Sequence, residues 1–590
     1  MFLPKERYFL VLVVVLPLLA ASANILLYLF PPHGYAYVGD RDEIMLFTSV
    51  FSLKNNFDSP WDNVKIFFTP MNGPPFFVMT FAFIASVLNM SPILLQAVLK
   101  YAFTLLILCA AYNIFALLIK DEIKRRLSFL LFLLYNGIGG IVFLLGRLAT
   151  TPDKIFSLIP NIPVITDLPE LGTAGGLYAL NQTLTYHIVP LATGYLALLF
   201  FLKSQKYSAF ISGVFLGLTF LFYPIFGIGS AVLIFIGFMT SLEKKTSKKL
   251  FLVYFIAAPF ITPWIYSYLS SPVLFDVYRK TTAFVGSAQI HSLVISMSAL
   301  LIFAAYGLLH RVNKKFVLYL LVPLFLFSLT RLITILHNSA NPIITSITNS
   351  NASLKTLYSS VFLLEGIALI IVLKLVIDLI YSNIHNYKFF VVSLLVFFFV
   401  SVSSLNTARF VAFLIVPAAV LAADGILLFS ERHRINYKKI TAGILILTIP
   451  SIIIFTGMRF YYPQELSYPT YYTNSEYNAL KFLEGFEQGR LLSSREIGTF
   501  APFLANKKAM FAMYENQSQL DYNDRVKDYE IFFSDSNEDI KKDILKKYGI
   551  KYVFLGENEK KLSRNSSFMN LDFLERLHYC LEEAQIFRVR

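Results

Sequence analysis

Directly after the first hydrophobic run of the chain stands Tyr37-Val38-Gly39-Asp40-Arg41-Asp42-Glu43-Ile44-Met45-Leu46-Phe47, which sets three carboxylates within four positions. The chain otherwise holds few charges, since hydrophobic residues make up 56% of it and charged residues 15%. Acidic groups next to membrane hydrocarbon are costly unless they are paired, solvated or used, so these carboxylates are candidate site residues. A structural account also exists: Asp40 can cap a helix, with Glu43 as its capping-box partner. The two roles can coexist.

Length and composition predict a membrane protein with many spans. The chain has 590 residues, 58 of them Phe, and a mean hydropathy of +0.61. Its apolar runs of about 20 residues are long enough to cross the hydrocarbon layer. The formal net charge is +14, and most of the basic residues that produce it lie in short loops between these runs. The charge therefore indicates membrane orientation rather than nucleic-acid binding. Cys109 and Cys580 provide neither a disulfide framework nor a metal cluster.

The basic residues predict the topology. Lys5 and Arg7 precede the apolar run 8–30, which we interpret as an uncleaved anchor with a cytoplasmic N-terminus. All basic loops fall on the cytoplasmic side if 74–119 makes one net crossing, so 74–90 is expected to be a short juxtamembrane or re-entrant outer helix. Further spans are predicted at about 95–119, 127–148, 184–202, 208–222, 224–241, 250–269, 291–310, 316–335, 354–381, 388–404, 408–429 and 440–457.

The predicted fold is therefore an α-helical polytopic membrane domain over 1–457 with about 13 spans, including a first outer loop at 31–94. The tail, 458–590, has the composition of a soluble protein and falls on the extracytoplasmic side. Helical patterns there alternate with short apolar strands, which predicts a small α/β domain. The helices are expected at 475–483, 521–533 and 537–548, and the strands at 490–493 and 550–555.

Short motifs stand in a fixed order along the chain: Asp40-Arg41-Asp42-Glu43, Gly73-Pro74-Pro75-Phe76, Asn181–Pro190 with His187, Thr407-Ala408-Arg409-Phe410 with Pro417, Ile497–Pro502 and Lys547–Val553. Together with the anchor, the many spans and the outer domain, they resemble the GT-C class of glycosyltransferases. This class includes the catalytic subunit of oligosaccharyltransferase, protein O-mannosyltransferases and the aminoarabinose transferase of lipid A.

The resemblance implies a GT-C-like fold and a sugar donor linked to polyprenyl phosphate or pyrophosphate. It also implies an extracytoplasmic acceptor and a place in the cell membrane. Two departures limit what carries over. No His precedes Pro74-Pro75, so the role of that family residue has no counterpart here. The peptide-binding motif Trp-Trp-Asp-Tyr-Gly is absent from the sequence, which disfavours an oligosaccharyltransferase.

Transfer from a lipid phosphate requires the acceptor to lose a proton and the charge of the leaving phosphate to be stabilised. The catalytic candidates are Asp40, Asp42 and Glu43, with Asp42 or Asp40 as the base and the choice between them open. Asp42 and Asp40 can also hold a divalent cation, Mg²⁺ or Mn²⁺, that does part of this work. A local ion pair with Arg41 is the structural alternative.

We expect an arginine to bind the phosphate, because its guanidinium group fits phosphate oxygens better than an ammonium group does. Arg147, Arg331 and Arg409 stand at outer ends of predicted spans, and Arg409 is preferred because it opens one. Each can instead be an interfacial arginine that extends toward water. His187, at the outer start of a span, can orient substrate or shuttle a proton, or be a hydrogen-bonded structural residue.

Two other classes of function stay open. One is a transporter or flippase of lipid-linked precursors, against which the missing repeat symmetry and the few charges in mid-membrane count. Such a protein would depend on Glu365, which lies well inside the predicted span 354–381. The other is a non-catalytic relative whose outer domain acts as an interaction module.

Overall fold

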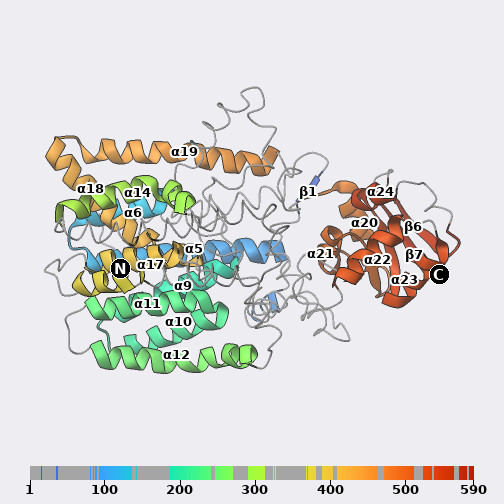
Figure 1. The fold of residues 1–590 in the computed structure, drawn as a ribbon, viewed down its shortest axis with the longest axis horizontal. Helices are drawn as coiled ribbons and strands as arrows, with labels where there is room; N and C mark the ends of the chain where they lie inside the picture. The colour runs from blue at the N-terminus through green and yellow to red at the C-terminus, as the bar shows by residue number, and fades with distance from the viewer. Residues whose placement is uncertain are drawn as a thin grey trace, which may run out of the picture.

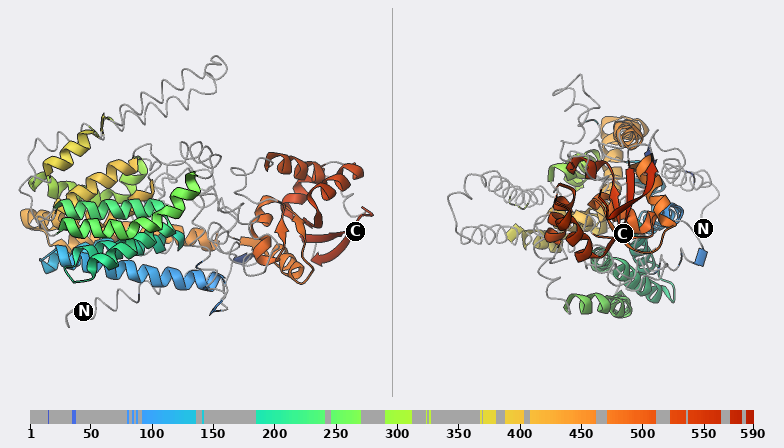
Figure 2. Two further views of the ribbon diagram at one scale, coloured as in Figure 1. Left: turned by 90° about the horizontal axis from the view of Figure 1, so that it is seen from below. Right: turned by 90° about the vertical axis from the view of Figure 1, so that its right-hand side faces the viewer.

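A computed structural model describes residues 35–37, 92–135, 185–240, 246–269, 290–311, 370–379, 388–402, 408–461, 471–510, 522–534, 537–563, 571–580 and 584–590, besides a few single positions. This part of the chain is mostly helical. It forms a helical bundle and a C-terminal α/β domain (Figure 1). The two regions lie side by side along the longest axis of the molecule, as two further views confirm (Figure 2).

The bundle is built from long apolar helices joined by short turns. Its helices are α5 (Pro92–Leu118), α6 (Glu122–Leu134), α9 (Thr185–Leu202), α10 (Ser208–Phe222), α11 (Pro224–Thr240), α12 (Thr246–Leu269), α14 (Ile290–Arg311), α17 (Lys388–Val402), η5 (Ala408–Phe413), α18 (Ile415–His433) and α19 (Tyr437–Tyr461). Residues 203–207 join α9 to α10, Tyr223 alone joins α10 to α11, and 434–436 join α18 to α19. Connections this short make successive helices antiparallel.

The predicted span 408–429 is divided in the structure. It begins as the 3-10 helix η5 and continues as the α-helix α18. Pro417 is the third residue of α18, within the first turn, where a missing backbone N–H costs no helical hydrogen bond. Helix α18 follows η5 and runs away from the C-terminal domain, and α19 runs back toward that domain (Figure 1). The η5 end of the bundle is therefore the end nearest that domain.

Glycines let several helices approach closely. A Cβ on Gly425 of α18 would lie 1.8 Å from the carbonyl oxygen of Phe303 in α14, and one on Gly217 of α10 would lie 2.4 Å from the ring of Phe260 in α12. No larger residue fits these positions without moving a helix. Small residues at helix contacts are how membrane bundles pack without a hydrophobic driving force between helices.

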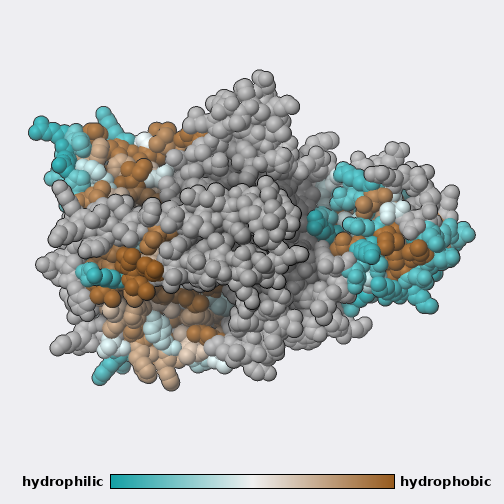
Figure 3. Space-filling model, in the orientation of Figure 1, coloured by the Kyte–Doolittle hydropathy of each residue, from teal (hydrophilic) through white to brown (hydrophobic). Residues whose placement is uncertain are grey.

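The outer surface of the bundle is apolar. Large hydrophobic side chains point outward on several helices, among them Phe251 and Phe255 of α12, Ile302 of α14, Ile370, and Ile446 of α19. In the C-terminal domain, within the described residues, only Phe482 and Ile540 do so. Figure 3 shows the same contrast on one face of the molecule. Large apolar side chains exposed on several helices fit lipid contact.

By length and composition, one helix among the described residues, Val98–Leu118, meets the requirement for crossing a membrane. Shorter apolar helices accompany it at His187–Leu202, Ser208–Phe222, Pro224–Thr240, Met297–His310 and Lys388–Val400.

The C-terminal domain contains a five-stranded mixed sheet of order β4-β3-β5-β7-β6. Its strands are β3 (Arg490–Leu492), β4 (Lys508–Ala509), β5 (Ile550–Leu555), β6 (Leu574–Cys580) and β7 (Ala584–Val589). Strand β3 pairs in parallel with β4 and β5, whereas β7 pairs antiparallel with β5 and β6. The helices are α20 (Asn474–Glu484), α21 (Arg495–Leu504), α22 (Tyr522–Ser534), α23 (Glu538–Tyr548) and α24 (Glu557–Leu562).

Strand β5 forms the centre of this domain because both of its faces are covered. Tyr552 and Phe554 belong to a core with α20 and α21, whereas Val553 and Leu555 belong to a second core with α22 and α23. This is the alternation that a pleated strand imposes on successive side chains. Gly549, with φ of 60°, ends α23 in the left-handed conformation and leads directly into β5.

A second, two-stranded sheet joins distant parts of the chain. Strand β1 (Tyr35–Tyr37) pairs antiparallel with β2 (Tyr471–Thr473), which immediately precedes α20. Residues 35–37 and the strand that leads into the C-terminal domain are thus hydrogen-bonded partners.

Candidate functional site

His187 lies in the first turn of α9 and is buried, with 4% of its surface exposed. Its ring packs against Tyr223, at the turn between α10 and α11, and against Phe226 of α11, with ring centroids 5.4 Å away in both cases. The local sequence explains this position, since the Tyr223-Pro224 turn brings the two aromatic rings back over the start of α9. His187 is therefore held between three helices.

Polar contacts fix the same three helices one to two turns further along. The hydroxyl of Thr219 in α10 donates to the hydroxyl of Thr193 in α9 at 2.9 Å. Gly194 lies against Ser230 of α11, where a Cβ would come within 2.1 Å of the serine oxygen. Because these contacts allow little sliding between helices, the ring of His187 has a defined place at this end of the bundle.

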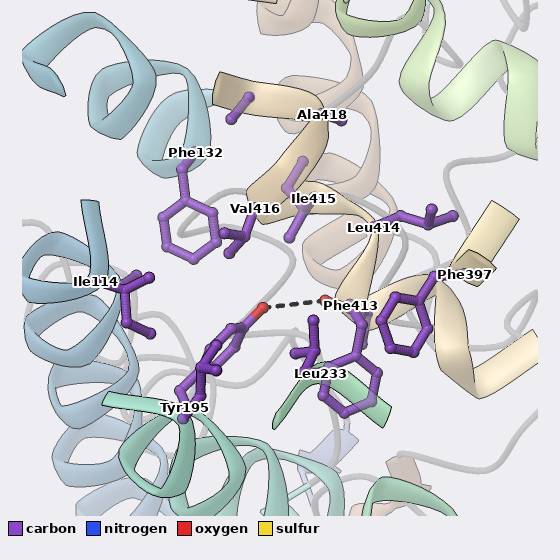
Figure 4. Close-up of a cluster of buried hydrophobic side chains, with 14 of the residues drawn as sticks. Ile114, Phe132, Tyr195, Leu233, Phe397, Phe413, Leu414, Ile415, Val416 and Ala418 are labelled. Carbon is purple, nitrogen blue, oxygen red and sulfur yellow. Dashed lines mark hydrogen bonds between the residues drawn. The ribbon is translucent and has the colours of Figure 1, made fainter. Parts of the chain in front are cut away.

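The 3-10 helix η5 packs against the same group of helices (Figure 4). The hydroxyl of Tyr195 in α9 donates to the carbonyl of Ala412 at 3.3 Å. Phe413 stacks on Phe397 of α17 at 5.1 Å and lies against Gly229, where a Cβ would come within 2.3 Å of its ring. Irregular backbone inside an apolar bundle needs such protein partners for its carbonyls.

Phe226 links the two candidate motifs. Its ring contacts His187 at 5.4 Å on one side and Phe413 at 5.9 Å on the other. The sequence predicted His187 and Arg409 as separate substrate-binding candidates. The structure joins His187 through Phe226 to Phe413, the last residue of η5, and Arg409 is the second residue of that helix. The side chain of Arg409 lies outside the described residues.

Most of the other predicted site residues also lie outside the described residues. These are Asp40, Asp42, Glu43, Arg147 and Arg331, together with Glu365 and the motif at 73–76. The described strand β1 ends three residues before Asp40. Within the described residues, no group of three His, Cys, Asp or Glu side chains could hold a metal ion. The acids predicted for Mg²⁺ or Mn²⁺, Asp40 and Asp42, remain predictions.

The C-terminal domain contains a buried carboxylate that sequence reasoning missed. Glu559 of α24 accepts hydrogen bonds from the backbone N–H of Gly556 at 3.0 Å and of Ser494. Burial raises the pKa of its carboxyl group. Its place, where β3 and β5 end, is where ligands commonly bind in open parallel sheets. Here the domain fills that place with its own side chain, so Glu559 is structural.

No protein-family model and no curated protein matches the chain. Several solved structures are similar to it at low identity. The Archaeoglobus fulgidus oligosaccharyltransferase, in complex with Zn and sulfate, is 14% identical with a TM-score of 0.42, over 97% of this chain and 73% of that one. The arabinofuranosyltransferase AftD from Mycobacteria is 10% identical with a TM-score of 0.49, over 99% of this chain and 40% of that one.

ArnT from Cupriavidus metallidurans, bound to undecaprenyl phosphate, is 10% identical with a TM-score of 0.43, over 98% of this chain and 97% of that one. All three are GT-C glycosyltransferases. They belong to the class that the sequence motifs resemble. Similarity at this level does not decide a reaction, so the residues of this chain have to carry the functional argument.

Proposed function

We propose that this chain is an integral membrane glycosyltransferase that moves a sugar from a polyprenyl phosphate or pyrophosphate to an extracytoplasmic acceptor. The observation that carries the proposal is the contact of Phe226 with both His187 and Phe413. It links His187 to the helix of Arg409, two residues far apart in the sequence that stand in motifs resembling GT-C proteins.

The apolar outer surface of the bundle supports a lipid-linked donor. A polyprenyl chain partitions into hydrocarbon, so an enzyme that uses it has to present its site at the membrane. Residues such as Phe255 and Ile446, 66% and 61% exposed, give the bundle the surface that lipid contact requires. The donor then reaches the site from within the bilayer.

The reaction needs one group that activates the acceptor and another that stabilises the leaving phosphate. The acceptor oxygen or nitrogen attacks the anomeric carbon, the bond from that carbon to the phosphate oxygen breaks, and the bonding electron pair leaves with the phosphate. Asp42 or Asp40 takes the proton of the acceptor. Arg409 stabilises the charge that develops on the phosphate. His187 orients the substrate at the start of α9.

The first test is transfer of label from a panel of radiolabelled polyprenyl-phosphate sugars to endogenous acceptors in membranes. Arg409→Ala should lower transfer by about 100-fold or more, because it removes a preorganised charge from the leaving group. Arg432→Ala is the matched control, since Arg432 lies at the far end of α18 and is exposed. Equal activity of the Arg409 and Arg432 variants would refute the assigned role of Arg409.

The carboxylates are tested in the same assay. Asp42→Asn and Asp40→Asn keep side-chain size but remove the basic oxygen, so at least one of them should abolish transfer at normal expression. Asp58→Asn, in the same predicted outer loop, is the control. Zero transfer by the wild type with every donor of the panel would overturn the proposed function itself.

A further inference from the structure

The starts of α10 and α12 form a basic end of the bundle that the proposed function does not use. Lys206 precedes α10 by two residues, Lys248 is the third residue of α12, and both side chains are exposed. The segments 203–210 and 246–255, which contain both lysines, include no acidic residue. This end of the bundle therefore presents positive charge that neither segment neutralises by itself.

Packing between the helices brings the two lysines to the same end. A Cβ on Gly213 of α10 would lie 2.7 Å from the side chain of Ile256 in α12, and the Gly217 contact one turn further along α10 continues the same alignment. The two helices thus run parallel and side by side (Figure 1). At their starts, the ammonium group of Lys249 donates a hydrogen bond to the carbonyl of Lys203, directly after α9. The first turn of α12 therefore lies against the turn that leads into α10.

Exposed aromatic rings follow each lysine along its helix. Phe210 of α10 is exposed and stands four residues after Lys206. Phe251 and Phe255 are exposed, stack with ring centroids 6.0 Å apart, and stand three and seven residues after Lys248. This spacing puts all three side chains on one face of α12. Each helix thus presents a cation at its end and apolar rings further in, as residues at a membrane interface do.

We infer that this end of the α10–α12 pair binds an anionic phospholipid. The headgroup phosphate lies at Lys206 and Lys248, whose charges complement it, and the acyl chains cover Phe210 and Phe251. The predicted topology places the basic loops on the cytoplasmic side, where the leaflet is rich in anionic lipids. The inference is independent of the proposed function, because it concerns the end of α9 opposite to His187.

Melting of the delipidated, detergent-solubilised full-length protein tests the preference for an anionic headgroup. Phosphatidylglycerol added to the micelles should raise the melting temperature, because a ligand that binds only the folded state stabilises it. Phosphatidylcholine with the same acyl chains should raise it less, since its headgroup carries no net charge. Equal shifts from the two lipids would refute the inference. An equal shift from inorganic phosphate alone would show a free-anion site and would also overturn it.

Lys206→Gln with Lys248→Gln tests where the lipid binds. This double variant should lower the affinity for phosphatidylglycerol, measured by native mass spectrometry, by about 30-fold, since each lysine near an anionic lipid contributes roughly five-fold. Lys206→Arg with Lys248→Arg keeps the charge and should retain binding. Lys542→Gln with Lys546→Gln changes two exposed lysines of α23 and is the charge-matched control. Equal losses in the two glutamine variants would show an effect of net charge alone and contradict the site.

The apolar half of the site gives a different signature. Phe210→Ala with Phe251→Ala removes the rings that the acyl chains cover, so it should weaken phosphatidylglycerol and phosphatidylcholine by similar factors. The lysine variant should weaken phosphatidylglycerol alone. Unchanged affinity for both lipids in the alanine variant would show that the acyl chains lie elsewhere, and would refute the site as we describe it.

Discussion

Lys124 of α6 and Asp424 of α18 form a buried ion pair inside the bundle, with an N–O distance of 2.7 Å and side chains 6% and 8% exposed. In the sequence, Lys124 is only one charge of a basic loop that predicts orientation. The structure turns it inward, where it joins helices 300 residues apart. Burying two charges costs several kcal/mol per ion, which only their mutual contact and further hydrogen bonds offset.

Replacing one residue of this pair should therefore lower the stability of the protein more than replacing both residues. Asp424→Leu should destabilise the detergent-solubilised protein by about 3 kcal/mol or more in a thermal melt, because it leaves the ammonium of Lys124 buried without its counter-ion. Lys124→Met added to Asp424→Leu should restore most of this loss. Arg126→Met, which breaks the exposed pair with Glu122, should change stability by less than about 1 kcal/mol. An additive double variant would contradict the expected coupling.

Glu559 and Glu476 give the C-terminal domain a predictable pH dependence. Burial raises the pKa of both carboxyl groups, so the folded domain binds their protons more tightly than the unfolded chain does. The stability that these protons provide is complete below the unfolded pKa, about 4.3, and is lost as the pH rises through the folded pKa. Hydrogen exchange of β5 amides should accordingly be faster at pH 8 than at pH 5, beyond the intrinsic pH effect. Glu559→Gln should reduce this difference, and an unchanged profile would contradict the assignment.

At the scale of elements, η5 is the part of the bundle whose conformation a linear pattern does not reveal. Residues 408–429 are mostly apolar and predict one span, yet Ala408–Phe413 form a 3-10 helix. Its conformation depends on other helices. The hydroxyl of Tyr195 donates a hydrogen bond to the carbonyl of Ala412, and Gly229, which has no side chain, leaves room for the ring of Phe413. These partners come from α9 and α11, distant in sequence.

Tyr195→Phe tests whether η5 serves the site. It should cost about 1–3 kcal/mol of stability by leaving the buried carbonyl of Ala412 without its donor, and it should lower glycosyl transfer by displacing the helix of Arg409. Tyr254→Phe is a matched control, because the Tyr254 hydroxyl also donates to a backbone carbonyl, that of Ala231 at 2.8 Å, away from η5. We expect the two variants to lower the melting temperature by similar amounts. Only the Tyr195 variant should lose glycosyl transfer. Equal transfer would mean that η5 is only structural.

At the scale of the whole molecule, the two regions differ in the solvent that they require. The bundle exposes large apolar side chains, whereas the C-terminal domain buries its apolar side chains in two cores around one sheet. The surface of the bundle therefore suits lipid, and the surface of the domain suits water. Helix α19 is the last described element of the bundle, and β2 is the first described element of the domain.

A charged side chain introduced on the surface of the bundle should reduce membrane insertion, whereas one introduced on the C-terminal domain should not. Phe255→Lys puts an ammonium group in the middle of α12. Inserting such a group into the centre of a bilayer costs about 2.5–3.5 kcal/mol, so the amount of protein in carbonate-washed membranes should fall. Phe482→Lys changes an equally apolar, 41% exposed residue of the C-terminal domain and should leave that amount unchanged. Equal yields would show that α12 does not face lipid.

The sequence by itself determined several of the helices and the central strand of the C-terminal sheet. The predicted spans 184–202, 208–222 and 224–241 correspond to α9, α10 and α11 within a residue, and the predicted strand 550–555 is β5. Apolar runs bounded by Pro, Gly and charged turns suffice for this, because helix ends and strand alternation are local effects. The sequence analysis did not predict the strands β1, β2, β4, β6 and β7 or the helices α21 and α24.

Only the tertiary structure decided which segments meet. The join of His187 with η5 through Phe226, the Lys124–Asp424 pair and the β1–β2 ladder each unite residues far apart in the chain. None leaves a periodic or compositional signal, because one sequence pattern permits many helix neighbours. Packing selects among them, through glycines that admit close contact and buried polar groups that require one particular partner.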